Sequence, residues 1–202
     1  MIKTIMRLLV LVSVFVFCFC ALPDSRYPSL KGLHKTVIFD QTMTEEDIAV
    51  TKQVMHAWEC STNNRIQFTY IQYPSEQELA DITDLDHSVI IKNVETDDPR
   101  IHDRNGSMPP GTYTVAIYEA HRSQIPDILV AKAFISTNHE YGLYVEHELG
   151  HSFGLGHIEN TLEPMIPIMD PIPSRSFGIT NEDLLALAEH YGIPLEPMHV
   201  CQ

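Results

Sequence analysis

The stretch from His147 to His157 constrains this chain more than any other, because it places three histidines and one glutamate at fixed intervals. It reads HExxHxxGxxH. On a helix, His147 and His151 project from the same face, since they are four residues apart. Glu148 lies one step around the helix, too far off that face to be a ligand but near enough to hold a metal-bound water.

The third histidine indicates which kind of metal site this is. If the helix continued, His157 would lie roughly 15 Å along the axis from His147, whereas a zinc–nitrogen bond measures only about 2.0–2.1 Å. The chain must therefore turn before His157. Gly154 is the predicted turning point, because glycine adopts the left-handed conformation that ends helices. Three protein nitrogens with an open fourth position predict a catalytic zinc, since a structural zinc has four protein ligands.

These residues resemble the signature of the metzincin metallopeptidases, HExxHxxGxxH followed by a Met-turn. The segment 168–171, Ile-Met-Asp-Pro, is similar to the Met-turn of matrixins and points to Met169. Met165 is the alternative, but no Asp-Pro follows it. Residues 177–192 resemble the matrixin C-terminal helix, with a threonine cap, an acidic first turn and an end near Tyr191-Gly192.

The resemblance implies an α+β, metzincin-like zincin fold, in which a twisted mixed five-stranded sheet lies over an active-site helix and a C-terminal helix follows. It also implies a zinc-dependent endopeptidase, a monomer acting on protein or peptide substrates. His147, His151 and His157 would hold one zinc ion, and Glu148 would be the general base. A zinc-binding module without activity and a cell-wall peptide amidase on the same fold remain as alternatives.

The chain departs from the matrixin pattern at several places. Ile158 stands where matrixins usually carry serine or threonine, and no cysteine-bearing propeptide motif is present. The nearest material for a second, structural zinc is His102, Asp103 and His121. The polar loop 95–111 is a candidate for calcium, although its carboxylates are not in an EF-hand register. Because of these departures, the chain is described as matrixin-like.

The N-terminus predicts export. Lys3 and Arg7 precede an apolar run, so residues 1–20 are typical of a signal peptide cleaved before Ala21. We expect a secreted or extracytoplasmic protein, with an uncleaved anchor or a lipid on Cys18 or Cys20 as alternatives. Residues 21–202 suit a single metallopeptidase catalytic domain.

The net charge argues against some classes of binding partner, and the cysteines predict one disulfide. The chain has 13 Lys and Arg against 27 Asp and Glu, a net charge of −14, which argues against nucleic acid or an anionic membrane as a partner. After signal cleavage only Cys60 and Cys201 remain, and in an exported protein they are predicted to pair. Two free thiols are the alternative.

Apolar patterning predicts the order of elements. Thr44 caps a helix that runs to about Cys60, with Trp58 in the core. By resemblance, the substrate-binding edge strand is either 129–134 or 112–120, and the sequence leaves both open. The expected strands cover residues 34–39, 66–73, 87–94, 112–120 and 128–135.

Overall fold

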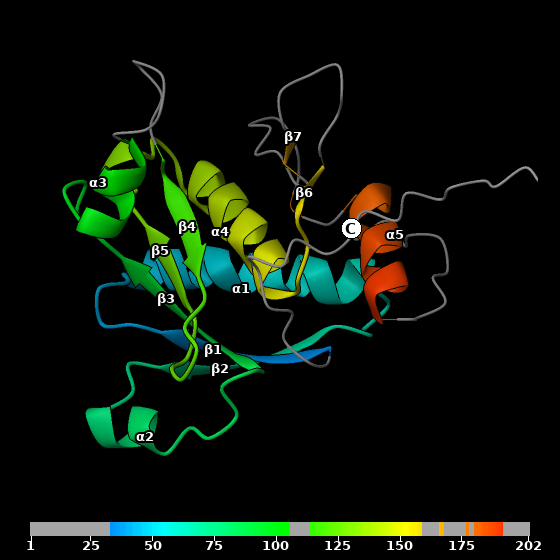
Figure 1. Ribbon diagram of the computed structural model, residues 1–202, viewed down its shortest axis with the longest axis horizontal. Helices are drawn as coiled ribbons and strands as arrows, with labels where there is room; N and C mark the ends of the chain where they lie inside the picture. Colours follow the sequence, from blue (N-terminus) through cyan, green and yellow to red (C-terminus); the bar gives the residue numbers. More distant parts are fainter. Residues whose placement is uncertain (1–32, 106–113, 159–165, 168–176, 178–179, 192–202) are drawn as a thin grey trace, which may run out of the picture.

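The computed structural model describes residues 33–105, 114–158, 166–167, 177 and 180–191 (Figure 1). Its centre is a five-stranded sheet of order β2-β1-β3-β5-β4. β1, β2, β3 and β5 run parallel, and β4 is antiparallel to β5. The strands are β1 (His34–Phe39), β2 (Gln67–Gln72), β3 (Ser88–Asn93), β4 (Ala116–Glu119) and β5 (Asp127–Val130).

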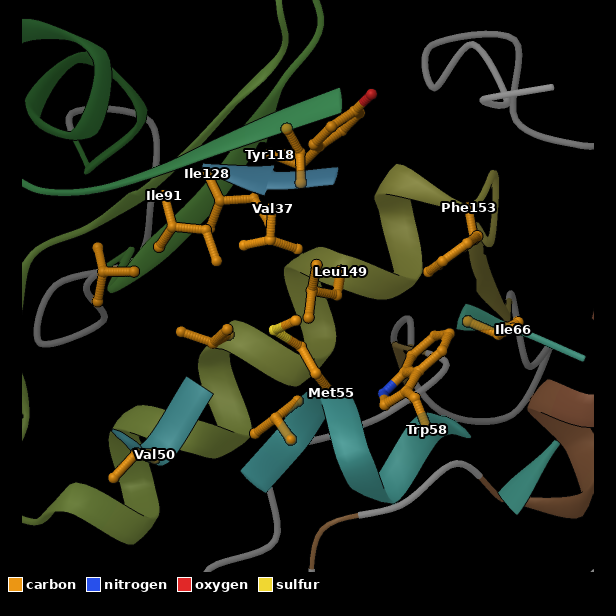
Figure 2. Close-up of a cluster of buried hydrophobic side chains, with 14 of the residues drawn as sticks. Val37, Val50, Met55, Trp58, Ile66, Ile91, Tyr118, Ile128, Leu149 and Phe153 are labelled. Carbon is orange, nitrogen blue, oxygen red and sulfur yellow. The ribbon is translucent and has the colours of Figure 1, made fainter. Parts of the chain in front are cut away.

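Two long helices, α1 (Glu45–Ser61) and α4 (Asn138–Ser152), pack against each other and against the sheet (Figure 1). The core lies between these layers. Figure 2 shows Val37, Ile91 and Ile128 of the sheet facing side chains of α1 and α4. The predicted α+β arrangement, with a mixed five-stranded sheet packed on long helices, is confirmed.

An aromatic stack joins the C-terminal ends of the two long helices. Trp58 of α1 is fully buried and stacks on Phe153, with ring centroids 5.2 Å apart and an interplanar angle of 19°. Phe68 of β2 forms a T-shaped pair with the same Phe153 ring, with ring centroids 5.8 Å apart. The prediction that Trp58 is a core residue is confirmed, and its ring fixes the end of α4 against α1 (Figure 2).

The helices begin where side-chain caps were expected. Thr44 and Asp47 form a reciprocal capping box at the start of α1. Thr180 and Asp183 bond in the same way before α5 (Asn181–Tyr191), the predicted C-terminal helix. Local sequence therefore specifies both starts, because each cap satisfies backbone N–H groups that the helix leaves unpaired.

The structure also corrects the predicted elements. The strand expected over 128–135 ends at Val130, and a 3₁₀ turn, η1 (Lys132–Phe134), follows it. The loop 95–111 contains the helix α3 (Pro99–Asn105), and another short helix, α2 (Glu76–Ala80), follows β2. Both helices are too short for a periodic apolar face to reveal them.

The sheet order decides between the two candidate edge strands. β5 lies between β3 and β4, so residues 129–130 are interior and the candidate 129–134 is wrong. β4 is at the edge, which favours 112–120, although residues 112 and 113 lie outside the described part. β2 forms the opposite edge.

Two further findings concern the predicted disulfide and the question of a membrane-spanning helix. Cys60 is disulfide-bonded, but its partner lies outside the described residues, so pairing with Cys201 stays a prediction. Within the part of the chain that is described, no helix has the length and apolar character needed to cross a membrane.

A buried carboxylate connects the start of α1 to the end of β3 and to η1. Asp47 is 1% exposed and accepts hydrogen bonds from Lys132 Nζ at 2.6 Å and from Asn93 Nδ2 at 2.9 Å. Thr44 donates to it from both its backbone N–H and its hydroxyl. Burial alone would raise the pKa of Asp47, but these hydrogen bonds outweigh burial and lower the pKa below its ordinary value.

We predict that Asp47→Asn lowers the free energy of unfolding by about 2 kcal/mol at neutral pH, because charge-assisted hydrogen bonds are lost. A carboxyl with a lowered folded pKa stabilises fully above its unfolded pKa of about 3.9 and loses this effect as pH falls through the folded pKa. Urea unfolding should therefore show the gap to wild type narrowing below pH 4. Asp81→Asn, at an exposed carboxylate, is the control, and an equal effect there would contradict the prediction.

Candidate metal centre

Helix α4 brings two of the predicted ligands together. His147 and His151 are 9% and 3% exposed and lie one turn apart on the buried part of the helix. Their Nε2 atoms are 3.1 Å apart, and their ring centroids are 4.7 Å apart at an interplanar angle of 89°. Both imidazoles therefore direct the same nitrogen to one point.

A backbone carbonyl orients one of these rings. His151 Nδ1 lies 2.8 Å from Leu155 O, and a carbonyl oxygen can only accept a hydrogen bond. The proton of neutral His151 is therefore on Nδ1, and the Nε2 lone pair is directed toward His147 Nε2. Ligating histidines are usually held in this way by a second hydrogen bond on the other ring nitrogen.

The histidine pair fits a zinc ion. Two nitrogens bound tetrahedrally at about 2.0–2.1 Å from zinc would be about 3.3 Å apart, close to the 3.1 Å between the two Nε2 atoms. Two lone pairs that face each other at this distance repel unless a proton or a cation lies between them. The donor type, the ring orientation and the spacing of these two histidines fit a zinc ion.

The helix ends where the motif predicts. Gly154 has φ of 85°, and its N–H donates to His151 O at 2.9 Å. Leu155 N–H reaches back to Gly150 O at 3.1 Å, which completes a Schellman motif. The chain then enters β6 (His157–Ile158), which pairs antiparallel with β7 (Ile166–Pro167).

The remaining site residues are placed less completely. Glu148 is in α4 between the two histidines and is 6% exposed. The backbone of His157 is in β6, but its side chain and all of Met169 lie outside the described part. Among the described side chains, no group of three or more His, Cys, Asp or Glu could hold a metal ion, so the predicted three-histidine set remains a prediction.

Some of the candidates for further metal sites have other partners in the structure. His121 Nε2 is 3.6 Å from Asp127 Oδ2, and Lys92 Nζ is 2.9 Å from the other oxygen of this carboxylate. Asp98, in the loop considered for calcium, is bonded by Arg100. His102 is exposed on α3, and the side chain of Asp103 is outside the described part. Residues 106–111 of the loop also lie outside the described part, so a second zinc and a calcium ion stay predictions.

Sequence reasoning missed two residues that contact the turn after His151. Lys35 Nζ donates to Ser152 O at 2.6 Å, and the Tyr191 hydroxyl donates to Phe153 O at 3.0 Å. For Lys35 a signal was present: period-2 alternation in the strand places it on the same face as Val37 and Phe39, which are core residues. A lysine on that face calls for a buried acceptor.

We predict that Gly154→Ala lowers the free energy of unfolding by about 1–2 kcal/mol, because alanine at positive φ brings Cβ against the following carbonyl. Gly154→Asn should cost less, since asparagine tolerates this conformation. Thermal and urea unfolding would measure both. Equal stability of the alanine variant and wild type would contradict the role given to this turn.

Comparison with known proteins supports the same interpretation as the geometry. The family model described as Matrixin matches residues 35–192, which span all of the described sheet except His34 and all of the described helices. A comparison with curated protein sequences finds no match. Matrixins are zinc metallopeptidases, and the match extends over most of this sequence, the HExxHxxGxxH segment included. This chain therefore belongs to the matrixin family.

Proposed function

We propose that this protein is a zinc-dependent endopeptidase that uses Glu148 as its general base. The observation that carries the proposal is the convergence of His147 Nε2 and His151 Nε2 at 3.1 Å, on the helix that also bears Glu148. Membership of the matrixin family makes it a metalloprotease in general terms. The residue roles below are the specific part of the proposal.

His147, His151 and His157 would hold the metal through neutral imidazoles. When bound, zinc lowers the pKa of a water molecule toward neutrality and polarises the substrate carbonyl. His157 follows Gly154 after the turn, at the start of β6. Met169 is proposed to pack beneath the site as a soft apolar floor, as the family resemblance implies.

Glu148 would move the proton. Its carboxylate takes the proton of the attacking water and then delivers it to the leaving amine of the cleaved peptide bond. The side chain is nearly buried, and a surrounding of low dielectric strengthens the carboxylate's interaction with charge that develops nearby. The same residue thus acts as base in the first step and as acid in the second.

The substrate would bind as an extended strand. β4 is an edge of the sheet and is antiparallel to β5, and the free side of an edge strand can pair with a peptide through main-chain hydrogen bonds. α4 contacts both β4 and β5, so a peptide along β4 would pass near the metal-binding helix. This arrangement favours internal peptide bonds of unfolded or extended segments.

We further propose export, with residues 1–20 removed and residues 21–202 forming one catalytic domain that acts as a monomer. The disulfide at Cys60 supports an oxidising compartment, because cytosolic thiols are normally reduced. A membrane-anchored or lipid-modified form is the competing arrangement. An antibody against the catalytic domain would distinguish them, because it would detect a secreted protein in the medium and an anchored or lipid-modified protein on intact cells.

Two alternative functions can be distinguished from an endopeptidase by what the protein cleaves. A non-catalytic zinc module would bind metal and cleave nothing, whereas a cell-wall amidase would release peptides from purified peptidoglycan and spare denatured protein. The intact Glu148 favours turnover over simple binding, since hydrolysis requires this base.

We predict that zinc-loaded residues 21–202 cleave an unfolded protein mixture and that Glu148→Gln lowers kcat by at least about 10²-fold. Zinc content should stay at one ion per chain in this variant, because Glu148 is not a proposed ligand. Glu189→Gln, an exposed glutamate on α5, is the matched control and should keep full activity. Full activity in Glu148→Gln would exclude the proposed proton transfer.

A further inference from the structure

The last carbonyl groups of α4 have two kinds of partner. Those of Gly150 and His151 accept backbone N–H groups within the Schellman turn. The next two, of Ser152 and Phe153, accept from side chains that are distant in sequence: Lys35 in the first strand and Tyr191 at the end of the last helix. The turn that leads from His151 toward His157 is therefore held from both ends of the domain.

Lys35 is an unusual donor for this position. It is 0% exposed, with Nζ 2.6 Å from Ser152 O and 4.2 Å from the centroid of the Phe153 ring. The negative end of the helix dipole and the face of an aromatic ring both attract a cation. Burial nevertheless lowers the pKa of Lys35 well below its ordinary value, so an apolar side chain of similar length would cost less to bury.

Tyr191 completes the hold from the other side. It is the last residue of α5, packs against the main hydrophobic core, and donates its hydroxyl proton to Phe153 O at 3.0 Å. Ser152 and Phe153 are consecutive, and the two donors come from separate elements, β1 and α5. Two such bonds to successive peptide units fix both the position and the rotation of the turn.

We propose that Lys35 and Tyr191 are positioning residues of the metal centre, which fix the turn after α4 and thereby set the geometry of its histidines. The inference rests on the proposed zinc-binding function. His151 directly precedes Ser152, and its ring is oriented by Leu155 O, two residues beyond Phe153. The turn thus controls both the His151 imidazole and the point where β6 begins with His157. A metal site needs its ligands held within about 0.5 Å.

The test is the zinc dissociation constant of the purified full chain, measured by competition with a chromophoric chelator, for wild type, Lys35→Met and Tyr191→Phe. We expect each variant to bind zinc about tenfold or more weakly, as is usual for residues that orient ligands. The visible spectrum of the Co²⁺-loaded protein should change as well. The melting temperature of Lys35→Met is measured beside its zinc affinity, because the substitution removes the cost of a buried amine but leaves Ser152 O without this donor.

Two matched controls separate positioning from general stability. Tyr141→Phe removes a hydroxyl from the first half of α4 that bonds Asn93, and Lys132→Met removes the amine that bonds Asp47. Both should lower the melting temperature but leave the zinc affinity and the Co²⁺ spectrum unchanged.

Unchanged affinity and spectrum in both Lys35→Met and Tyr191→Phe would overturn the inference while leaving the proposed function intact. A wild-type chain that binds no zinc would overturn the proposed function itself. If Lys35→Met fails to fold, Tyr191→Phe decides alone, because it removes a single oxygen atom from a half-buried ring.

Discussion

Burial of helix α4 against the sheet and against α1 is the constraint on which the rest of the structure depends. Leu149 and Val145 are fully buried in the core, and they fix the rotation of the helix about its axis. Once that rotation is fixed, His147 and His151 can point to only one place. The stacking of Trp58 on Phe153 then fixes the end of the helix. Hydrophobic packing therefore determines the orientation of the two histidines of the candidate site.

Polar groups inside this fold are retained where they join elements. Asp47 ties α1 to β3 and η1 through Asn93 and Lys132, and Lys35 ties β1 to the end of α4. A buried charge costs free energy unless hydrogen bonds compensate it. Asp47 has four such bonds, whereas the described contacts of Lys35 are one carbonyl and one ring. Lys35 is therefore less well compensated than Asp47, and it lies at the end of the helix that carries His147 and His151.

Sequence alone predicts much of this fold, and the residues show why. β1 has the expected bounds, and α1 and α5 start at the expected caps, because side-chain capping and apolar periodicity are local signals. The motif also predicts the pairing of His147 with His151 and the turn at Gly154. The strand expected to reach 135 stops at Val130, because the chain leaves the sheet in η1 after Ala131. Sheet order and the partners of Lys35 depend on contacts between distant residues, which periodicity does not encode.

The central claim is that three histidine nitrogens bind a single zinc ion in this chain and leave its fourth coordination position open to water or substrate. X-ray absorption at the zinc edge of the purified protein tests it most directly. The account predicts four light ligands at about 2.0–2.1 Å, with the multiple scattering of imidazole rings and no sulfur. A sulfur shell at about 2.3 Å, or a protein that retains no zinc after purification in its presence, would contradict it.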